Sequence, residues 1–132
     1  MTGSLMDRFA RQAAPDADTH DDFIQSFGAF GYLRNARDRA IMLELRRKNG
    51  NIRALGYAWL QAVEFDPSVG VLLMFPGSAI TLRGRNLNLA DAHGVSLLTG
   101  ILHHRVTFIQ EADQVAYMGS SRIETLVEKI EW

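Results

Sequence analysis

The chain has 132 residues, the usual length of a single domain. Its 47% hydrophobic and 22% charged residues are ordinary for a globular protein and exclude a disordered chain. With 14 Lys and Arg against 15 Asp and Glu, the net charge of −1 argues against a dedicated nucleic-acid binder, and zero cysteines exclude disulfides and thiolate metal sites.

Residues 1–19 carry no strong pattern, so we expect a poorly ordered N-terminal segment that is not a secretory signal. Thr19 is a candidate N-cap, and a helix is predicted from there to about Arg39. Gly28 and Gly31 weaken this helix, because each costs about 1 kcal/mol relative to alanine, so it forms either one helix or two short ones. Its apolar face, which is expected to dock on the domain, holds Phe23, Ile24, Phe27 and Phe30.

Residues 40–84 predict a meander of short antiparallel strands. Ile41, Leu43 and Leu45 alternate with Met42, Glu44 and Arg46, which is typical of a half-buried strand, and the following Asn49-Gly50 favours a tight hairpin. Asp66-Pro67-Ser68 and Pro76-Gly77-Ser78 are further turn signals. The remaining strands of the meander are predicted at about 52–57, 60–65, 69–75 and 79–83.

Residues 85–132 predict more helix. Apolar residues between 87 and 102 share a helical face over about four turns, with Gly94 and Gly100 as weak points. A sixth strand is predicted at 106–112. Ser121 and Glu124 have the spacing of a capping box, which predicts an amphipathic C-terminal helix that ends at Trp132.

Several short motifs of the meander match those of a known family. They are Leu43-x-Leu45 with Gly50, then Phe65-Asp66, then Val71-Leu72-Leu73, and finally Leu82-Arg83-Gly84-Arg85-Asn86-Leu87. Over about residues 35–87 the chain resembles the Sm-like family of small β-barrels. The resemblance implies a small barrel, assembly into rings and binding of single-stranded RNA. Two positions depart from the family pattern, since Gly70 replaces its base-contacting Asn and Ser68 replaces its stacking aromatic residue.

The expected fold class is therefore α+β. Residues 20–132 are predicted to form a single domain with a small, strongly bent antiparallel sheet or an Sm-like barrel of 5–6 strands. Three helices complete the predicted domain: one at the N-terminus, one inserted before the last strand, and one at the C-terminus.

Arg83, Arg85 and Asn86 are the candidate nucleic-acid-binding residues, because they gather polar groups where a strand ends. Arg83 can instead pair with a carboxylate, and Asn86 can cap a helix that begins near Leu87. We expect no catalytic residues, no metal and no cofactor. Neighbouring histidines on a helix, such as the pair at 103–104, point about 100° apart and do not share a metal as an i, i+4 pair does.

The leading functional hypothesis is a non-enzymatic structural or interaction module that forms a homo-oligomer through sheet edges or terminal helices. One alternative is an RNA-binding oligomer, in which a ring repeats Arg83 and Arg85 around a pore. Another is a small-ligand domain with a pocket lined by Tyr32, Tyr57 and Trp59. No apolar run approaches the roughly 18 residues of a membrane span, so we expect no membrane partner and a cytoplasmic location.

Overall fold

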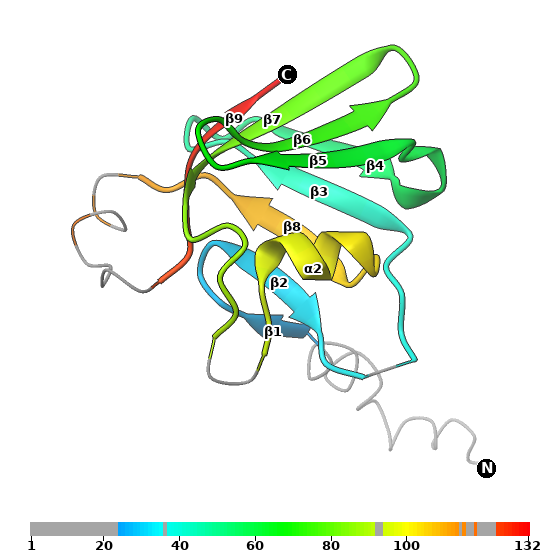
Figure 1. Cartoon of the computed structure of the whole chain (residues 1–132), viewed down its shortest axis with the longest axis horizontal. Coiled ribbons are helices and arrows are strands. Elements are labelled where there is room, and N and C mark those ends of the chain that lie inside the picture. Colours follow the sequence, from blue (N-terminus) through cyan, green and yellow to red (C-terminus); the bar gives the residue numbers. More distant parts are fainter. Residues whose placement is uncertain (1–23, 36, 92–93, 114, 116–117, 119–123) are drawn as a thin grey trace.

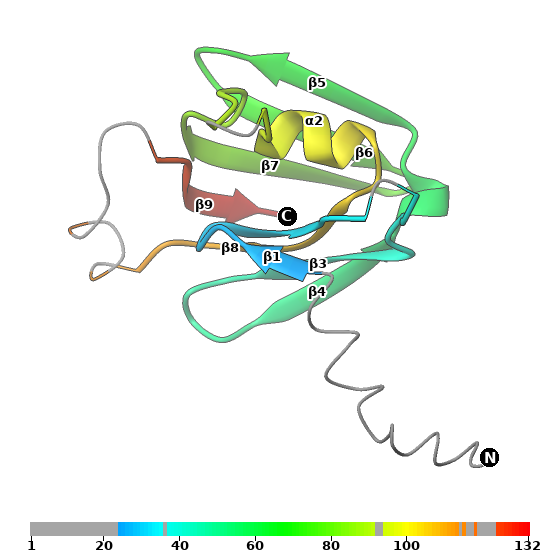
Figure 2. The same ribbon diagram turned by 90° about the horizontal axis from the view of Figure 1, so that it is seen from below.

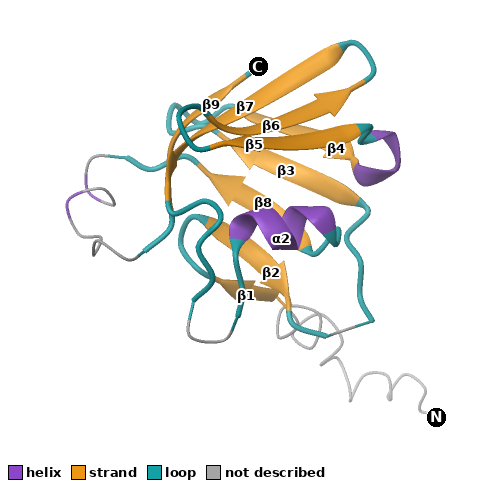
Figure 3. Ribbon diagram, in the orientation of Figure 1, coloured by secondary structure: helices purple, strands orange, loops and turns teal. Residues whose placement is uncertain are grey.

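The computed structural model describes residues 24–35, 37–91, 94–113, 115, 118 and 124–132. In this part of the chain nine strands form two sheets, accompanied by one short α-helix (Figures 1 and 3). The helix α2 spans Leu97–Leu102 and lies beside β8 (Figure 1), and a single 3-10 turn, η1, spans Tyr57–Trp59.

The first sheet has five strands in the order β1-β2-β8-β3-β4. Strands β3 and β8 run parallel, and the other neighbours are antiparallel. The central strand β8 is therefore inserted between two hairpins that precede it in the sequence. The strands are β1 Ile24–Ser26, β2 Phe30–Leu33, β3 Met42–Arg46, β4 Ile52–Gly56 and β8 Val106–Gln110.

The second sheet has four antiparallel strands in the order β5-β6-β7-β9. The two sheets form separate layers (Figure 2), and a parallel bridge between Glu111 and Val127 joins them where β8 ends. The core between the layers is built from fully buried side chains of both sheets and α2. The strands are β5 Ala62–Asp66, β6 Gly70–Phe75, β7 Ser78–Arg85 and β9 Leu126–Glu131, and the core includes Leu43, Leu45, Leu73, Ile80, Leu82, Ile101, Ile109 and Ile130.

The predicted strands of the meander and the sixth strand are confirmed as β3 to β8. The Asn49-Gly50 turn is confirmed too, with Gly50 at φ 96° and its N–H donating to the Arg47 carbonyl at 3.0 Å. The alternation over 41–46 places Leu43 and Leu45 in the core, as predicted, but Ile41, just before β3, is 82% exposed.

The α+β class and the small barrel of 5–6 strands are wrong. The described residues are mostly strand, with two sheets of five and four strands that do not close into a barrel. The predicted N-terminal helix is replaced by the β1–β2 hairpin, which turns at Gly28 with φ 81°. Gly31 lies against the Phe108 ring, where a Cβ would overlap the ring, so the residue that weakens a helix is required in this strand. The start of the predicted helix, with Thr19 and Phe23, lies outside the described residues.

The inserted helix is much shorter than predicted. It begins only at Leu97, after Ser96, whose hydroxyl accepts the Thr99 N–H at 3.0 Å as the N-cap. Leu87 is buried in the irregular connection that precedes it. The C-terminal helix is wrong as well, because β9 pairs with β7 there. Ser121 of the predicted capping box lies outside the described residues.

Candidate functional site

The three predicted site residues lie together on the surface. Arg83, Arg85 and Asn86 line a depression of about 530 Å³ between the end of β7, the β5–β6 turn and β9. Glu128 of β9 lines it too, so basic and acidic groups share the depression. Its walls also include Phe65, Pro67, Ser68, Val69, Gly70, Gly84, Leu87 and Asn88.

Arg83 is held by a carboxylate, which confirms that interpretation. Its Nε lies 3.0 Å from Oε1 of Glu131 on the neighbouring strand β9. Lys129 Nζ lies 3.8 Å from the other oxygen of Glu131. Because Glu131 already neutralises the Arg83 guanidinium, the depression offers a phosphate less positive charge than the sequence suggests. RNA binding by these residues stays a prediction.

Asn86 joins two connections and does not cap a helix. Its Nδ2 donates to the Glu124 carbonyl at 2.8 Å, and its own carbonyl accepts the Thr125 hydroxyl at 2.9 Å. Its φ of 59° is in the left-handed region, which asparagine tolerates better than most residues. Asn86 therefore positions the start of β9 beside the end of β7, and the cap interpretation is wrong because the helix begins ten residues further on, after Ser96.

Asp66 acts in the turn that rims this depression. Its Oδ1 accepts the Ser68 N–H at 2.9 Å and the Ser68 hydroxyl at 2.7 Å. These hydrogen bonds favour the charged form and lower the pKa of the Asp66 carboxyl below its usual value. Asp66 is thus explained by turn chemistry.

The three aromatic residues of the predicted ligand pocket do not share one wall. Tyr57 is buried, and its hydroxyl donates to the Val106 carbonyl at 2.7 Å. This burial raises the pKa of the Tyr57 phenol far above its usual value. Trp59, only two residues on, is 67% exposed, while the Arg105 guanidinium covers the Tyr32 ring at 4.8 Å.

The adjacent histidines follow α2, with His103 as its C-cap. The His104 ring stacks on Tyr57, with centroids 4.5 Å apart. Among the residues that the structure describes, no three His, Cys, Asp or Glu side chains gather as metal ligands do.

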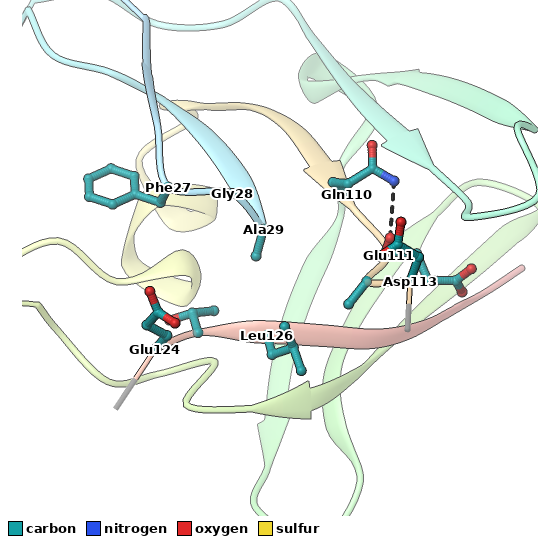
Figure 4. A pocket seen from close by; sticks show the side chains of 10 residues that line it. Phe27, Gly28, Ala29, Gln110, Glu111, Asp113, Glu124 and Leu126 are labelled. Atoms are coloured by element: carbon teal, nitrogen blue, oxygen red, sulfur yellow. Dashed lines mark hydrogen bonds between the residues drawn. The ribbon is translucent and has the colours of Figure 1, made fainter. Parts of the chain in front are cut away.

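A second cavity, of about 380 Å³, opens between the β1–β2 turn and the start of β9. Figure 4 shows Phe27 and Glu124 at one end and Glu111 and Asp113 at the other. Glu111 is 6% exposed, and its two oxygens accept the Lys48 N–H at 2.9 Å and the Ile130 N–H at 2.7 Å. The buried carboxylate thereby links the β3–β4 hairpin to β9 and is occupied by the fold.

The C-terminal residue is held close to this link. The Arg47 guanidinium lies 3.5 Å from the centre of the Trp132 ring, and Arg47 Nε donates to the Ile130 carbonyl at 3.2 Å. Arg47, which the sequence places in a basic hairpin tip, therefore stabilises β9 by a cation–π contact and a hydrogen bond.

The feature that sequence reasoning missed is an apolar surface on β3 and β4. Met42 is 47% exposed, Ile52 is 59% exposed and Trp59 is 67% exposed, and Ala54 lies exposed between them. We call these four residues the outer patch. Met42, Ile52 and Ala54 lie on the sheet face that points away from the core, because the alternate residues of β3, Leu43 and Leu45, are fully buried on the other face. Trp59 lies in η1, directly after β4.

Gly56 lets two apolar side chains pack over the end of β4. The Trp59 ring and the Met42 sulfur both come within 4 Å of where a Cβ on Gly56 would stand, the nearest atom being Trp59 Cδ1 at 3.1 Å. A side chain at this position would therefore crowd the Trp59 ring.

In the part of the chain that the structure covers, no helix is long and apolar enough to cross a membrane. Comparisons with protein-family models, curated proteins and solved structures find no match to this chain. The resemblance of residues 35–87 to Sm-like proteins therefore stays a prediction, and the function has to be argued from the surface alone.

Proposed function

We propose that this protein is a non-enzymatic interaction module that self-associates through the outer patch. The observation that carries the proposal is the exposure of Met42 on β3, Ile52 on β4 and Trp59 in η1, at one edge of a sheet. Large apolar groups that cluster on a surface mark association sites, because water is released when a second surface covers them. Burial contributes roughly 25 cal/mol per Å² of apolar area.

Trp59 is the expected anchor of this association. Tryptophan in the centre of an interface often contributes 2 kcal/mol or more when it is truncated, which is roughly a thirtyfold change in the dissociation constant. Trp59 is also the most exposed side chain of the outer patch, so its truncation removes contacts with a partner more than contacts within the fold.

The test is sedimentation velocity over a wide range of protein concentration. We expect the average mass of the natural chain to rise with concentration, and Trp59→Ser to weaken the self-association about thirtyfold. The matched control is Leu89→Ser, because Leu89 is 47% exposed but lies in the connection after β7. A natural chain that stays monomeric at every concentration, or a Leu89→Ser variant as weak as Trp59→Ser, overturns the proposal.

A further inference from the structure

The outer patch borders a strand whose second side is open. Strand β4 ends the order of the five-stranded sheet, and among the described residues only β3 pairs with it. The bonds that flank this ladder are Arg47 N–H to the Asn51 carbonyl at 2.8 Å and Tyr57 N–H to the Ile41 carbonyl at 3.0 Å. These two bonds determine which residues of β4 direct their backbone N–H and carbonyl groups to β3.

Hydrogen-bonded and non-bonded pairs alternate along an antiparallel ladder. Since the flanking pairs are bonded, the pairs that contain Arg53 and Leu55 are bonded as well. The N–H and carbonyl groups of Ile52, Ala54 and Gly56 therefore point toward the open side of β4. The side chains of Ile52 and Ala54 belong to the outer face, so one row of residues offers both hydrogen bonds and apolar contact.

Nothing in β4 blocks the approach of another strand. Its sequence, Ile-Arg-Ala-Leu-Gly, has no proline or lysine, and its ladder with β3 runs without a bulge. The edge of β9 is protected by contrast, because Glu111 accepts the Ile130 N–H and Arg47 donates to the Ile130 carbonyl. The edge of β9 is thus covered by contacts within the chain, while β4 can accept another strand.

Building on the proposed function, we propose that two copies pair β4 with β4 in antiparallel fashion about a two-fold axis at Ala54. In this register Ala54 faces the Ala54 of the second copy, and Ile52 faces Gly56. Each Ile52 side chain then lies beside the Trp59 ring and the Met42 sulfur, which pack over Gly56 on the other copy. The interface is self-complementary, since each copy supplies both the isoleucine and the apolar groups that it contacts.

The charges on the strand agree with this register. Arg53 is the charged residue of β4, and it faces Leu55 of the second copy, so no like charges stand opposite each other. The Arg53 side chain is turned away toward Ser78, whose hydroxyl accepts from Nη2 at 2.6 Å. The contact is smaller than the roughly 20–30 residues per side of a standard interface, so we expect a weak, reversible dimer.

The decisive experiment changes the residue on the two-fold axis. Ala54→Lys and Ala54→Glu each place like charges directly opposite, so we expect each variant alone to dimerise about fivefold or more weakly. An equal mixture of the two should dimerise again, because Lys then faces Glu. Ala62→Lys is the matched control, since Ala62 lies on β5, an edge strand of the other sheet.

The chain has no cysteine, so single cysteines give a second measure in an otherwise natural protein. Residues in a bonded antiparallel pair have Cα atoms about 5.5 Å apart, which a disulfide spans. Under mild oxidation we expect Ala54→Cys to form a covalent dimer well before Ala62→Cys.

The outcomes separate this pairing from the proposed function. A natural chain that self-associates while Ala54→Lys does so equally well overturns the β4 pairing and leaves association by the outer patch standing. A mixture of the Lys and Glu variants that fails to recover overturns the register centred on Ala54. A natural chain that never associates overturns both.

Discussion

Removing the Glu111 carboxylate should weaken the junction between the two sheets. In Glu111→Ala the N–H of Ile130, which is buried and bonded at 2.7 Å, loses its acceptor. An unsatisfied buried donor costs about 1–3 kcal/mol. The N–H of Lys48 is only partly buried, so water can replace its acceptor at a smaller cost. We therefore expect the free energy of unfolding to fall by about 1–3 kcal/mol, or somewhat more.

Urea unfolding measures this change directly, as a lower midpoint with an unchanged dependence on urea concentration. Glu128→Ala is the matched control, because Glu128 is an exposed carboxylate in β9 and should change stability by less than about 0.5 kcal/mol. Glu111→Gln should fall between the two, since its amide keeps one acceptor. The reasoning fails if Glu111→Ala is as stable as the Glu128→Ala variant.

Three further changes test other contacts. Gly84→Ala should lower the melting temperature, because a Cβ would overlap the Leu126 carbonyl in the β7–β9 ladder. Such overpacking costs about 1–3 kcal/mol. An unchanged melting temperature would show that the two strands can move apart without cost. The charged form of Asp66 stabilises the folded state above the usual carboxyl pKa, and this stabilisation is lost as the pH falls below about 4. Between pH 6 and pH 3, the free energy of urea unfolding should therefore fall less for Asp66→Ala than for the natural chain. An equal fall for both proteins would contradict this. Burial should keep the Tyr57 phenol protonated where ordinary tyrosines ionise, near pH 10, so Tyr57→Phe should leave the absorbance change of the folded protein around that pH unaltered.

Most of the strands that sequence alone predicted pair with a neighbour in the chain, β8 being the exception. Residues 41–46 show a period of two and, with 52–57, flank Asn49-Gly50, so pattern and turn agree. The C-terminal segment misled because Leu126, Val127 and Ile130 also have helical spacing. Two buried residues in succession occur in β9, where Val127 bridges to Glu111 and the register with β7 shifts between Arg83 and Gly84, so that Glu128 is an extra residue in β9. That arrangement depends on distant segments.

The candidate site shows the same limit. The sequence identified Arg83, Arg85 and Asn86 as candidate site residues and suggested that Arg83 can pair with a carboxylate. It did not identify the carboxylate. Glu131 lies 48 residues away in the chain and reaches Arg83 only through the β7–β9 ladder. The outer patch was missed because the exposure of Ile52 and Ala54 depends on which face of β4 packs on the core, and that of Trp59 on the direction of the turn η1 after β4. Residue propensities do not determine either.

The position of β8 has a consequence for how the polypeptide reaches its native state. The five-stranded sheet is complete only when β8 enters between β2 and β3, and Arg46 and Gln110, at the end of that parallel pair, are 64 residues apart. The successive hairpins of β5, β6 and β7 need no such distant closure, so they can form early on the ribosome. Until β8 is synthesised, the edges of β2 and β3 that pair with it have unpaired backbone N–H and carbonyl groups. The nascent chain is most prone to aggregation during this interval.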